Sequence, residues 1–302
     1  MIRLDEELSQ KLAAIELVLM DVDGTLVTAE QRTFENVVAQ LRKLKVLSIG
    51  FSIATGRTIA GVSFVTERLR STRALLPPMI TYNGAVVIAG RDASLIEAER
   101  IDRFAFRALV ERCRRLDLHP LAYACRLTFD FMPLETVYTE FSKQPDREFN
   151  GMTVSRVPDM LDVDDDFVAV LVEMKDAASG VALTRELCDT FEGILRVTTS
   201  GGQYVEISAP KGTKAHAMRQ LARMRGVDIS RILAIGDNYN DLEMMKSAGV
   251  AAAVANAPEE VRAAAAINCT RPGGEGVVEV LRTLTRVVRS VRPHKRTPMF
   301  AR

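Results

Sequence analysis

Two aspartates one residue apart, Asp21 and Asp23, are the first residues in the chain whose types and spacing suggest chemistry. They follow the apolar run 17–20, which predicts a buried strand of a parallel sheet. Side chains two positions apart on an extended segment point the same way, so both carboxylates are expected to face one pocket. Burying a carboxylate is costly unless it is paired or bound to a metal. Two interpretations are open at this point: a nucleophile beside a general acid/base, or an Asp-Gly turn whose carboxylates cap backbone N–H groups.

A threonine and a lysine later in the chain could bind an anion. Thr55 and Gly56 follow the second apolar run, 47–54, and a hydroxyl with N–H groups at a strand-to-helix turn is suited to phosphate. Lys214 lies in the first turn of a predicted helix at 213–226, where the helix dipole disfavours a cation unless something negative binds nearby. Taken alone, a Thr helix cap and a surface lysine are the favoured interpretations of these two residues.

A second group of carboxylates repeats the pattern of the first. The buried strand predicted at 231–236 ends in Asp237 and Asp241, which open a helix at 242–248. Ligands of open α/β sheets bind at the carboxyl ends of the strands, so the two acidic pairs are expected to meet there. Four carboxylates converge only around a cation, and Mg²⁺ is the natural oxygen-binding choice. Hydroxyl, lysine and N–H groups in the same crevice fit a phosphoryl group.

The elements that must position these residues predict an α/β fold with two domains. Strands followed by turns and helices indicate a Rossmann-like parallel sheet with helices on both faces, built from residues 1–85 and 200–302. Between them, strand-like and helical pieces alternate without such polar strand ends, which indicates a second, inserted α+β domain at 86–199. The other elements expected in the core are strands at 79–82, 204–207, 250–254 and 267–270, and helices at 5–14, 31–45, 258–265 and 276–290.

Composition limits the classes of partner. The 302 residues are 47% hydrophobic and 26% charged, with a net charge of +1, which is typical of a globular protein with an ample core and disfavours nucleic acid or a membrane surface as partner. No apolar segment approaches the ~20 residues of a membrane span. Four scattered cysteines and three histidines argue against zinc, and the lack of a signal peptide favours a cytoplasmic protein. The basic C-terminal tail beyond residue 290 is interpreted as a solvated terminus rather than a polyanion-binding arm.

In these motifs the chain resembles the haloacid dehalogenase (HAD) superfamily of phosphotransferases. Four motifs appear in the family's order: Asp21-Val-Asp-Gly-Thr25, Ala54-Thr55-Gly-Arg57, Lys214, and Gly236-Asp237-Asn-Tyr-Asn-Asp241. Further segments are similar to the Cof-like branch with a large α/β cap: Tyr82-Asn83-Gly84-Ala85, Val254-Ala255-Asn256-Ala257-Pro258 and Glu275-Gly276-Val277. The resemblance covers the whole expected core.

The resemblance implies a role for each motif residue. Asp21 would form an aspartyl-phosphate, and Asp23 would act as general acid and then as general base. Thr55, the Gly56 N–H and Lys214 would hold the phosphoryl oxygens. Gly24, Arg57, Asn83 and Asn240 would contribute to phosphate or substrate binding. Mg²⁺ would be held by the Asp21 carboxylate, the Asp23 carbonyl and Asp237, with Asp241 as a further ligand or as a support.

The predicted function is a Mg²⁺-dependent phosphatase acting on a small phosphorylated metabolite, such as a sugar phosphate or a phosphorylated cofactor. A related capped enzyme, either a phosphosugar mutase or a sugar-conjugate phosphatase, is the alternative of the same class. A phospho-ligand sensor without catalysis is disfavoured, because a pure binder gains nothing from a carboxylate facing a phosphate. The cap offers no motif that identifies the substrate, and the oligomeric state is open.

Overall fold

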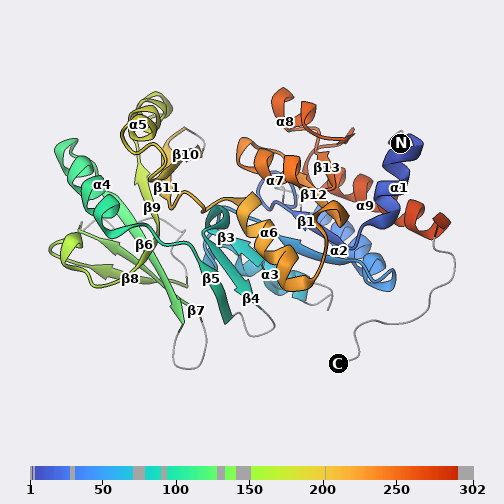
Figure 1. Cartoon of the computed structure of the whole chain (residues 1–302), viewed down its shortest axis with the longest axis horizontal. Coiled ribbons are helices and arrows are strands. Elements are labelled where there is room, and N and C mark those ends of the chain that lie inside the picture. Colours follow the sequence, from blue (N-terminus) through green and yellow to red (C-terminus); the bar gives the residue numbers. More distant parts are fainter. Residues whose placement is uncertain are drawn as a thin grey trace. The chain divides into compact units, whose positions relative to one another are not determined.

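Two compact units make up the chain (Figure 1). The computed structural model describes residues 2, 4–27, 31–70, 79–89, 94–127, 133–140, 151–200 and 202–291. The first unit consists of Met1–Thr55, Phe64–Ile80 and Lys214–Arg302, and the second of Gly56–Ser63 and Thr81–Thr213. The basic tail singled out in the sequence, from residue 292 onward, lies outside the described residues.

A parallel sheet of five strands forms the centre of the first unit. Its strand order is β14-β13-β12-β1-β2, and every adjacent pair is parallel. The strands are β1 (Leu17–Met20), β2 (Gly50–Ile53), β12 (Ile232–Gly236), β13 (Val250–Ala253) and β14 (Ile267–Asn268). All residues of β1, β2, β12 and β13 are buried, as the uninterrupted apolar runs predict for strands covered on both faces.

Helices cover both faces of this sheet. They are α1 (Glu6–Ala14), α2 (Gln31–Val46), α3 (Ser63–Arg70), α6 (Lys214–Arg225), α7 (Leu242–Ser247), α8 (Glu259–Ala263) and α9 (Gly273–Val291). From β1 the chain passes through α2 to β2 on one side, whereas from β12 it passes through α7 to β13 on the other. Right-handed crossovers in opposite directions place their helices on opposite faces. Accordingly, α9 packs against α1 and α2, and α6 packs against α7. The predicted α/β fold is confirmed.

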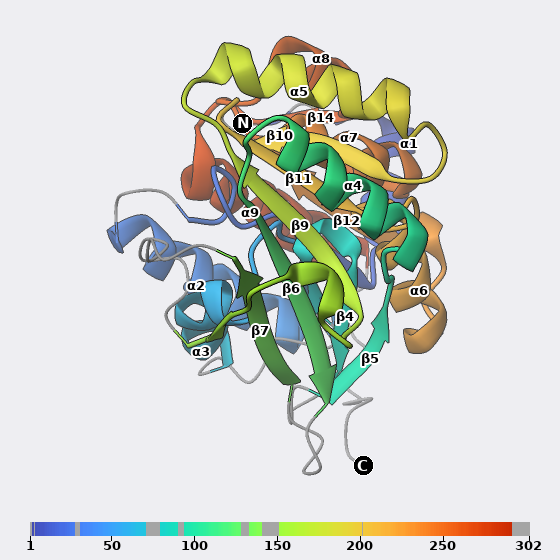
Figure 2. The same ribbon diagram turned by 90° about the vertical axis from the view of Figure 1, so that its left-hand side faces the viewer.

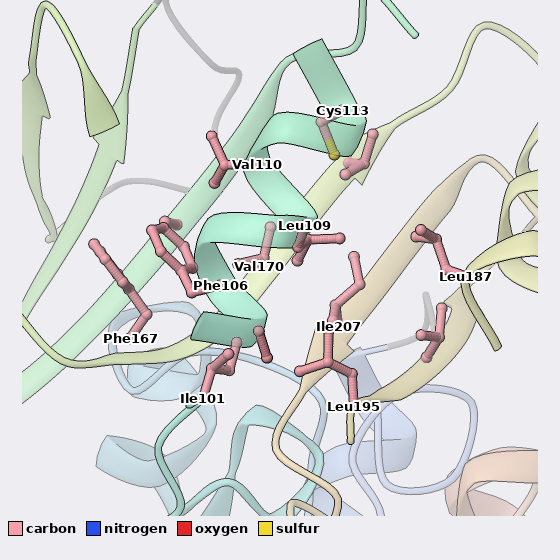
Figure 3. Close-up of a cluster of buried hydrophobic side chains, with 14 of the residues drawn as sticks. Ile101, Phe106, Leu109, Val110, Cys113, Phe167, Val170, Leu187, Leu195 and Ile207 are labelled. Carbon is pink, nitrogen blue, oxygen red and sulfur yellow. The ribbon is translucent and has the colours of Figure 1, made fainter. Parts of the chain in front are cut away.

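A six-stranded, mostly antiparallel sheet forms the second unit, in the order β10-β11-β9-β6-β7-β8. The strands are β6 (Pro120–Leu127), β7 (Pro133–Thr139), β8 (Thr153–Arg156), β9 (Phe167–Glu173), β10 (Arg196–Ser200) and β11 (Tyr204–Ser208). Helices α4 (Arg103–Arg115) and α5 (Ala177–Thr190) lie on one face (Figure 2). Between the helices and the sheet is an apolar core that includes Phe106, Leu109, Phe167, Leu187 and Ile207 (Figure 3).

The opposite face of this sheet contacts a short hairpin. Its strands, β4 (Val86–Ala89) and β5 (Ser94–Ala98), pair antiparallel. Val86 and Ile88 pack with Tyr123, Val137 and Val168 in a second apolar cluster. Both faces of the six-stranded sheet are thereby used in packing.

The limits of the second unit differ from those expected of the inserted domain. The segment 204–207 was expected in the parallel core, but β11 pairs antiparallel with β9 and β10. Strand β3 (Met79–Thr81) runs from the first unit into the second, and Gly56–Ser63 also groups with the second. A short apolar run does not encode the direction of its neighbours, which is why 204–207 resembles another core strand. Residues 160–162 (η4) and 229–231 (η5) each form a single 3₁₀ turn.

Candidate active site

The carboxyl edge of the parallel sheet gathers polar residues from three adjacent strands. Asp21 directly follows β1 and donates its N–H to Ile235 of β12 at 2.9 Å. Ala54 follows β2 and donates its N–H to Met20 of β1 at 2.8 Å. These contacts align the strand ends, so Asp21, the buried Thr55 and Asp237 emerge at one edge. The parallel sheet predicted from the sequence accounts for this arrangement, because parallel strands bring their carboxyl ends to one edge.

Three carboxylates converge at this edge. Asp21, Asp237 and Asp241 each offer an oxygen, and these atoms all lie within 4.8 Å of one another. Asp21 is 5% exposed and Asp241 is fully buried, while Asp237 is partly buried. Oxygen donors this close match what a hard divalent cation requires. The part of the chain that is described therefore holds an acidic cluster consistent with a metal site.

Lys214 supplies the positive charge within the cluster. Its Nζ donates to Asp21 Oδ1 at 2.5 Å and to Asp241 Oδ1 at 2.7 Å. Lys214 is the first residue of α6 and is only 2% exposed. Burial by itself would lower the pKa of this ammonium group, but the Asp21 and Asp241 carboxylates outweigh burial and raise it. The lysine is therefore charged, and both carboxylates are held toward it.

Negative charge exceeds positive charge in this cluster. Three ionised carboxylates with one ammonium group would leave a net charge of −2. Burial raises the pKa of Asp21 well above its usual range, against the opposing effect of Lys214, and it raises the pKa of Asp237 to about 6. Burial disfavours the ionised form of these carboxyl groups, and a cation bound beside them would favour it. A divalent ion would supply that charge, so the residues present fit the Mg²⁺ expected from the sequence.

Asp237 is held in place by two neighbours. The Thr25 hydroxyl donates to its Oδ1 at 2.7 Å, and Asn256 Nδ2 donates to its Oδ2 at 3.1 Å. The same Asn256 nitrogen donates to the Gly24 carbonyl at 3.1 Å, and Asn256 Oδ1 accepts from the N–H of Gly273, the first residue of α9, at 2.8 Å. No role in the site was expected for Asn256. The signal available was its place in a segment similar to the Cof-like branch.

Gly24 has a steric reason to be glycine. Its φ of +79° lies in the left-handed region, and a Cβ built on it would lie 2.3 Å from Asp237 Oδ2. The prediction for Gly24 was phosphate or substrate binding. The structure adds that only glycine at this position leaves room for the Asp237 carboxylate.

Asp241 organises the loop after β12. Its Oδ2 accepts from the N–H groups of Asp237 and Asn238 at 3.1 Å each, while Oδ1 is held by Lys214. Asp241 ends the short helix η6 (Tyr239–Asp241), which also carries the partly buried Asn240. Both Asp241 oxygens therefore accept bonds from the protein, which favours the supporting role among the two expected for it.

The carboxylate of Asp23 is exposed and does not belong to the three-carboxylate cluster. Asp23 forms a backbone bridge with Val27 in the turn after β1. An exposed carboxylate is suited to exchanging protons with substrate and water. The sequence predicted that four carboxylates, including that of Asp23, converge around a cation, whereas the cluster holds three. The family resemblance implied only the Asp23 backbone carbonyl as a metal ligand.

Gly56, Arg57 and Asn83 lie beside one another in the second unit. A Cβ built on Gly56 would lie 3.1 Å from the Asn83 side-chain amide, and the Tyr82 N–H donates to the Arg57 carbonyl at 3.0 Å. Arg57 NH1 donates to the carbonyl of Gly61 at 3.1 Å. These three predicted substrate residues thus lie together in the second unit, whereas the three clustered carboxylates belong to the first unit.

Comparison with protein families identifies a match over most of the chain. The profile of the haloacid dehalogenase-like hydrolases, Hydrolase_3, matches residues 18–281. None of the helices in the described part of the chain combines the length and apolar character that crossing a membrane requires.

Several similar proteins are named phosphatases. A putative phosphatase of Bacillus subtilis is 26% identical over 283 residues, covering 89% of this chain and 98% of its own. The 5-amino-6-(5-phospho-D-ribitylamino)uracil phosphatase of Escherichia coli is 24% identical, with 89% and 95% covered. A phosphoglycolate phosphatase of Methanopyrus kandleri is 25% identical, with 89% and 96% covered.

Solved structures share the fold. A haloacid dehalogenase-like hydrolase of Bacteroides thetaiotaomicron has a TM-score of 0.74 at 26% identity, covering 89% of this chain and 99% of its own. A putative HAD/COF-like hydrolase of Plasmodium vivax has a TM-score of 0.77 at 21% identity, with 94% and 98% covered.

Proposed function

Because this chain belongs to the haloacid dehalogenase-like hydrolase family and is an enzyme of the phosphatase type, we propose that it hydrolyses small phosphorylated metabolites through an aspartyl-phosphate on Asp21, with Mg²⁺ as cofactor. The observation that carries the proposal is the cluster of three carboxylates around the buried Lys214. An arrangement with more negative than positive charge is suited to a metal ion and, with it, to a phosphate ester.

The metal would be held by the carboxylates of Asp21 and Asp237 and by the Asp23 carbonyl. Bound there, Mg²⁺ offsets the repulsion between an anionic nucleophile and an anionic ester. Thr25 and Asn256 support this proposal, because their hydrogen bonds fix the orientation of Asp237. Asp241 fixes the loop that carries Asp237.

Asp21 is the proposed nucleophile. One of its carboxylate oxygens attacks phosphorus, the bond from phosphorus to the ester oxygen breaks, and Asp23 gives its proton to the leaving alkoxide. In the second half-reaction Asp23 takes a proton from water, whose oxygen attacks phosphorus. The bond to Asp21 breaks, and inorganic phosphate leaves. The hydrogen bond from Lys214 to Oδ1 orients the Asp21 carboxylate for the attack.

The phosphoryl oxygens need donors in both half-reactions. Lys214 is charged and buried, and the Thr55 hydroxyl belongs to the same strand edge, so these two are proposed to bind them. The Gly56 N–H, the Gly24 N–H and Asn240 are proposed as further contacts to the phosphate. Arg57 and Asn83 are proposed to contact the remainder of the substrate.

Small phosphorylated metabolites are proposed as the substrate class because of the named relatives. The 5-amino-6-(5-phospho-D-ribitylamino)uracil phosphatase of E. coli and the phosphoglycolate phosphatase of M. kandleri are named for small phosphate monoesters. They span most of this chain at 24% and 25% identity, so they support the class of substrate and not one compound.

Release of inorganic phosphate from a panel of phosphorylated metabolites tests the proposal. We expect hydrolysis with Mg²⁺, none after EDTA treatment, and recovery when Mg²⁺ is restored. Asp23→Asn should slow both formation and hydrolysis of the aspartyl-phosphate. Full activity in EDTA would contradict the role of the metal. Transfer of the phosphoryl group within a sugar phosphate, without free phosphate, would favour the mutase alternative.

A further inference from the structure

A buried glutamate of the second unit, Glu135 on β7, holds the backbone of one loop and a tyrosine hydroxyl of a turn, and it has no part in the proposed chemistry. Its Oε1 accepts from the Ile59 N–H at 2.6 Å, and its Oε2 accepts from the Ala60 N–H at 2.7 Å. Oε1 also accepts from the Tyr82 hydroxyl at 2.6 Å. Glu135 is 6% exposed. One carboxylate therefore joins the loop at 56–62 to the turn at 82–84.

The three donors to Glu135 are neutral, and a carboxylate, which offers only acceptor sites, can accept from all of them. Burial raises the pKa of Glu135, while the bonds from Tyr82, Ala60 and Ile59 oppose that rise. Burial and the nearby Glu135 charge raise the pKa of Tyr82 well above its usual range, so its hydroxyl keeps the proton that it donates. Hydrogen bonds to a buried charge are strong, and losing one leaves a group unsatisfied. These bonds therefore tie the loop at 56–62 to the turn at 82–84.

The turn that Glu135 holds has an unfavourable backbone. Tyr82 and Asn83 have φ values of +50° and +53°, in the left-handed region that side chains disfavour. Such a conformation persists where its surroundings enforce it, and it concentrates at functional sites. Here Glu135 holds the Tyr82 hydroxyl, and Glu206 accepts from Asn83 Nδ2 at 2.5 Å. The Tyr82 N–H joins the turn to the Arg57 carbonyl.

We propose that Glu135 is a positioning residue that fixes the loop of Arg57 and the turn of Asn83 as one body and thereby sets how tightly the phosphate ester binds. Glu135 does not act on the reacting atoms. The inference rests on the proposed function, because Arg57 and Asn83 contact substrate only in that function. The proposal adds Glu135, from a stretch of sequence without a motif, to the residues that influence substrate binding.

Two variants test Glu135, with kinetics and amide hydrogen exchange as readouts. Glu135→Gln keeps the shape but replaces one acceptor oxygen with a donor, and Tyr82→Phe removes only one of the three donors. For Glu135→Gln we expect KM for p-nitrophenyl phosphate to rise about tenfold, the effect of one charge-assisted hydrogen bond, with kcat within about twofold of wild type. Tyr82→Phe should change KM in the same direction by less. Exposed Glu173 provides the matched control, Glu173→Gln, with unchanged KM.

Amide exchange at Ile59 and Ala60 should accelerate in Glu135→Gln, while exchange in α4 and β9 stays as in wild type. This readout also identifies a variant that fails to fold, because exchange in α4 and β9 would then accelerate as well. If Glu135→Gln fails to fold, KM and amide exchange of Tyr82→Phe test the proposal in its place. Unchanged KM and unchanged exchange at 59–60 in folded variants would overturn the proposal, as would a fall in kcat alone. A wild-type protein without Mg²⁺-dependent hydrolysis would overturn the proposed function itself, whereas an active wild type with an unaffected Glu135→Gln overturns only the role of Glu135.

Discussion

Two buried carboxylate centres, one in each unit, solve the problem of an internal negative charge in opposite ways. In the first unit, Lys214 pairs with Asp21 and Asp241, and Asp237 adds a third carboxylate to the cluster without a second cation among the described residues. In the second unit, Glu135 has three hydrogen-bond donors for its single charge. The first centre lacks positive charge, and the second has the donors it needs.

The difference separates a centre for chemistry from a centre for positioning. A cluster that lacks positive charge gains free energy when a cation binds, so its empty form is not its most stable form. A carboxylate that is already satisfied gains nothing from a ligand and serves to fix the backbone around it. Burial raises the pKa of Asp21, Asp237 and Glu135 alike, so the pKa does not separate the two centres. Carboxylates that crowd together with too few cations point to the reaction, whereas one with a donor for each oxygen points to the frame that presents the substrate.

The largest effect is expected for Asp21→Asn. An amide cannot act as the nucleophile, so kcat should fall by about 10³-fold or more. Stability should stay the same or rise, because the variant removes one of three crowded negative charges. Phosphate release and thermal unfolding measure the two effects. Retained turnover in this variant would contradict the nucleophile and, with it, the chemical character of the first centre.

The next largest effect concerns Lys214→Met. Removing the ammonium group leaves buried carboxylates without their partner, which typically costs about 3–5 kcal/mol of unfolding free energy. Urea denaturation measures the loss, and Lys211→Met, at an exposed lysine three residues earlier, is the matched control. Adding Asp241→Asn to Lys214→Met should restore part of the stability. If Lys214→Met were as stable as the control, the charge balance described for the cluster would be wrong.

A smaller effect is expected from the metal itself. At a Mg²⁺ concentration of 100 times its dissociation constant, stability should rise by about 2.7 kcal/mol. Thermal unfolding with EDTA and with increasing Mg²⁺ measures it. Asp237→Asn should lose most of this gain, whereas Glu135→Gln should keep it, because Glu135 has no place among the proposed ligands. An equal loss in both variants would remove the distinction between the two centres.

The sequence predicted the first centre better than the second for a physical reason. Uninterrupted apolar runs identify buried parallel strands, and parallel strands bring their carboxyl ends to one edge, so Asp21 and Asp237 could be placed together although they are distant in sequence. The dipole argument for Lys214 required nearby negative charge. In the structure Asp21 and Asp241 supply such charge within the protein.

The second centre has no such pattern. Glu135 lies in the stretch 133–165, whose sequence is polar and weakly patterned, yet this stretch contains β7 and β8. All four residues of β8 are at least partly exposed, so the alternation typical of a half-buried strand is missing. Two of the three donors to Glu135 are backbone N–H groups, which every residue except proline carries. The residue types of Ile59 and Ala60 therefore give no indication that their N–H groups bind Glu135.

Asn256 also escaped prediction, and its removal should have a smaller effect than the loss of Asp21, of Lys214 or of the metal. Asn256→Ala removes a donor to Asp237 Oδ2, so Mg²⁺ affinity should fall by about 10–100-fold, the usual cost of losing a residue that orients a metal ligand. At saturating Mg²⁺, kcat should return to near the wild-type value, because the hydrogen bonds described for Asn256 reach neither Asp21 nor Lys214. Mg²⁺ titration of the melting temperature and of activity measures both quantities.

The exposed Asn268, at the end of β14, gives the control Asn268→Ala, for which Mg²⁺ affinity should not change. Asn256 also accepts from the N–H at the start of α9, so a small loss of stability in EDTA is expected as well, of about 0.5–1.5 kcal/mol. The two effects are separable, because the loss in EDTA is independent of metal, whereas the fall in affinity appears only on titration. If Asn256→Ala lost stability in EDTA but bound Mg²⁺ like wild type, Asn256 would belong with Glu135 among the residues that fix backbone, and the first centre would orient Asp237 through Thr25 alone.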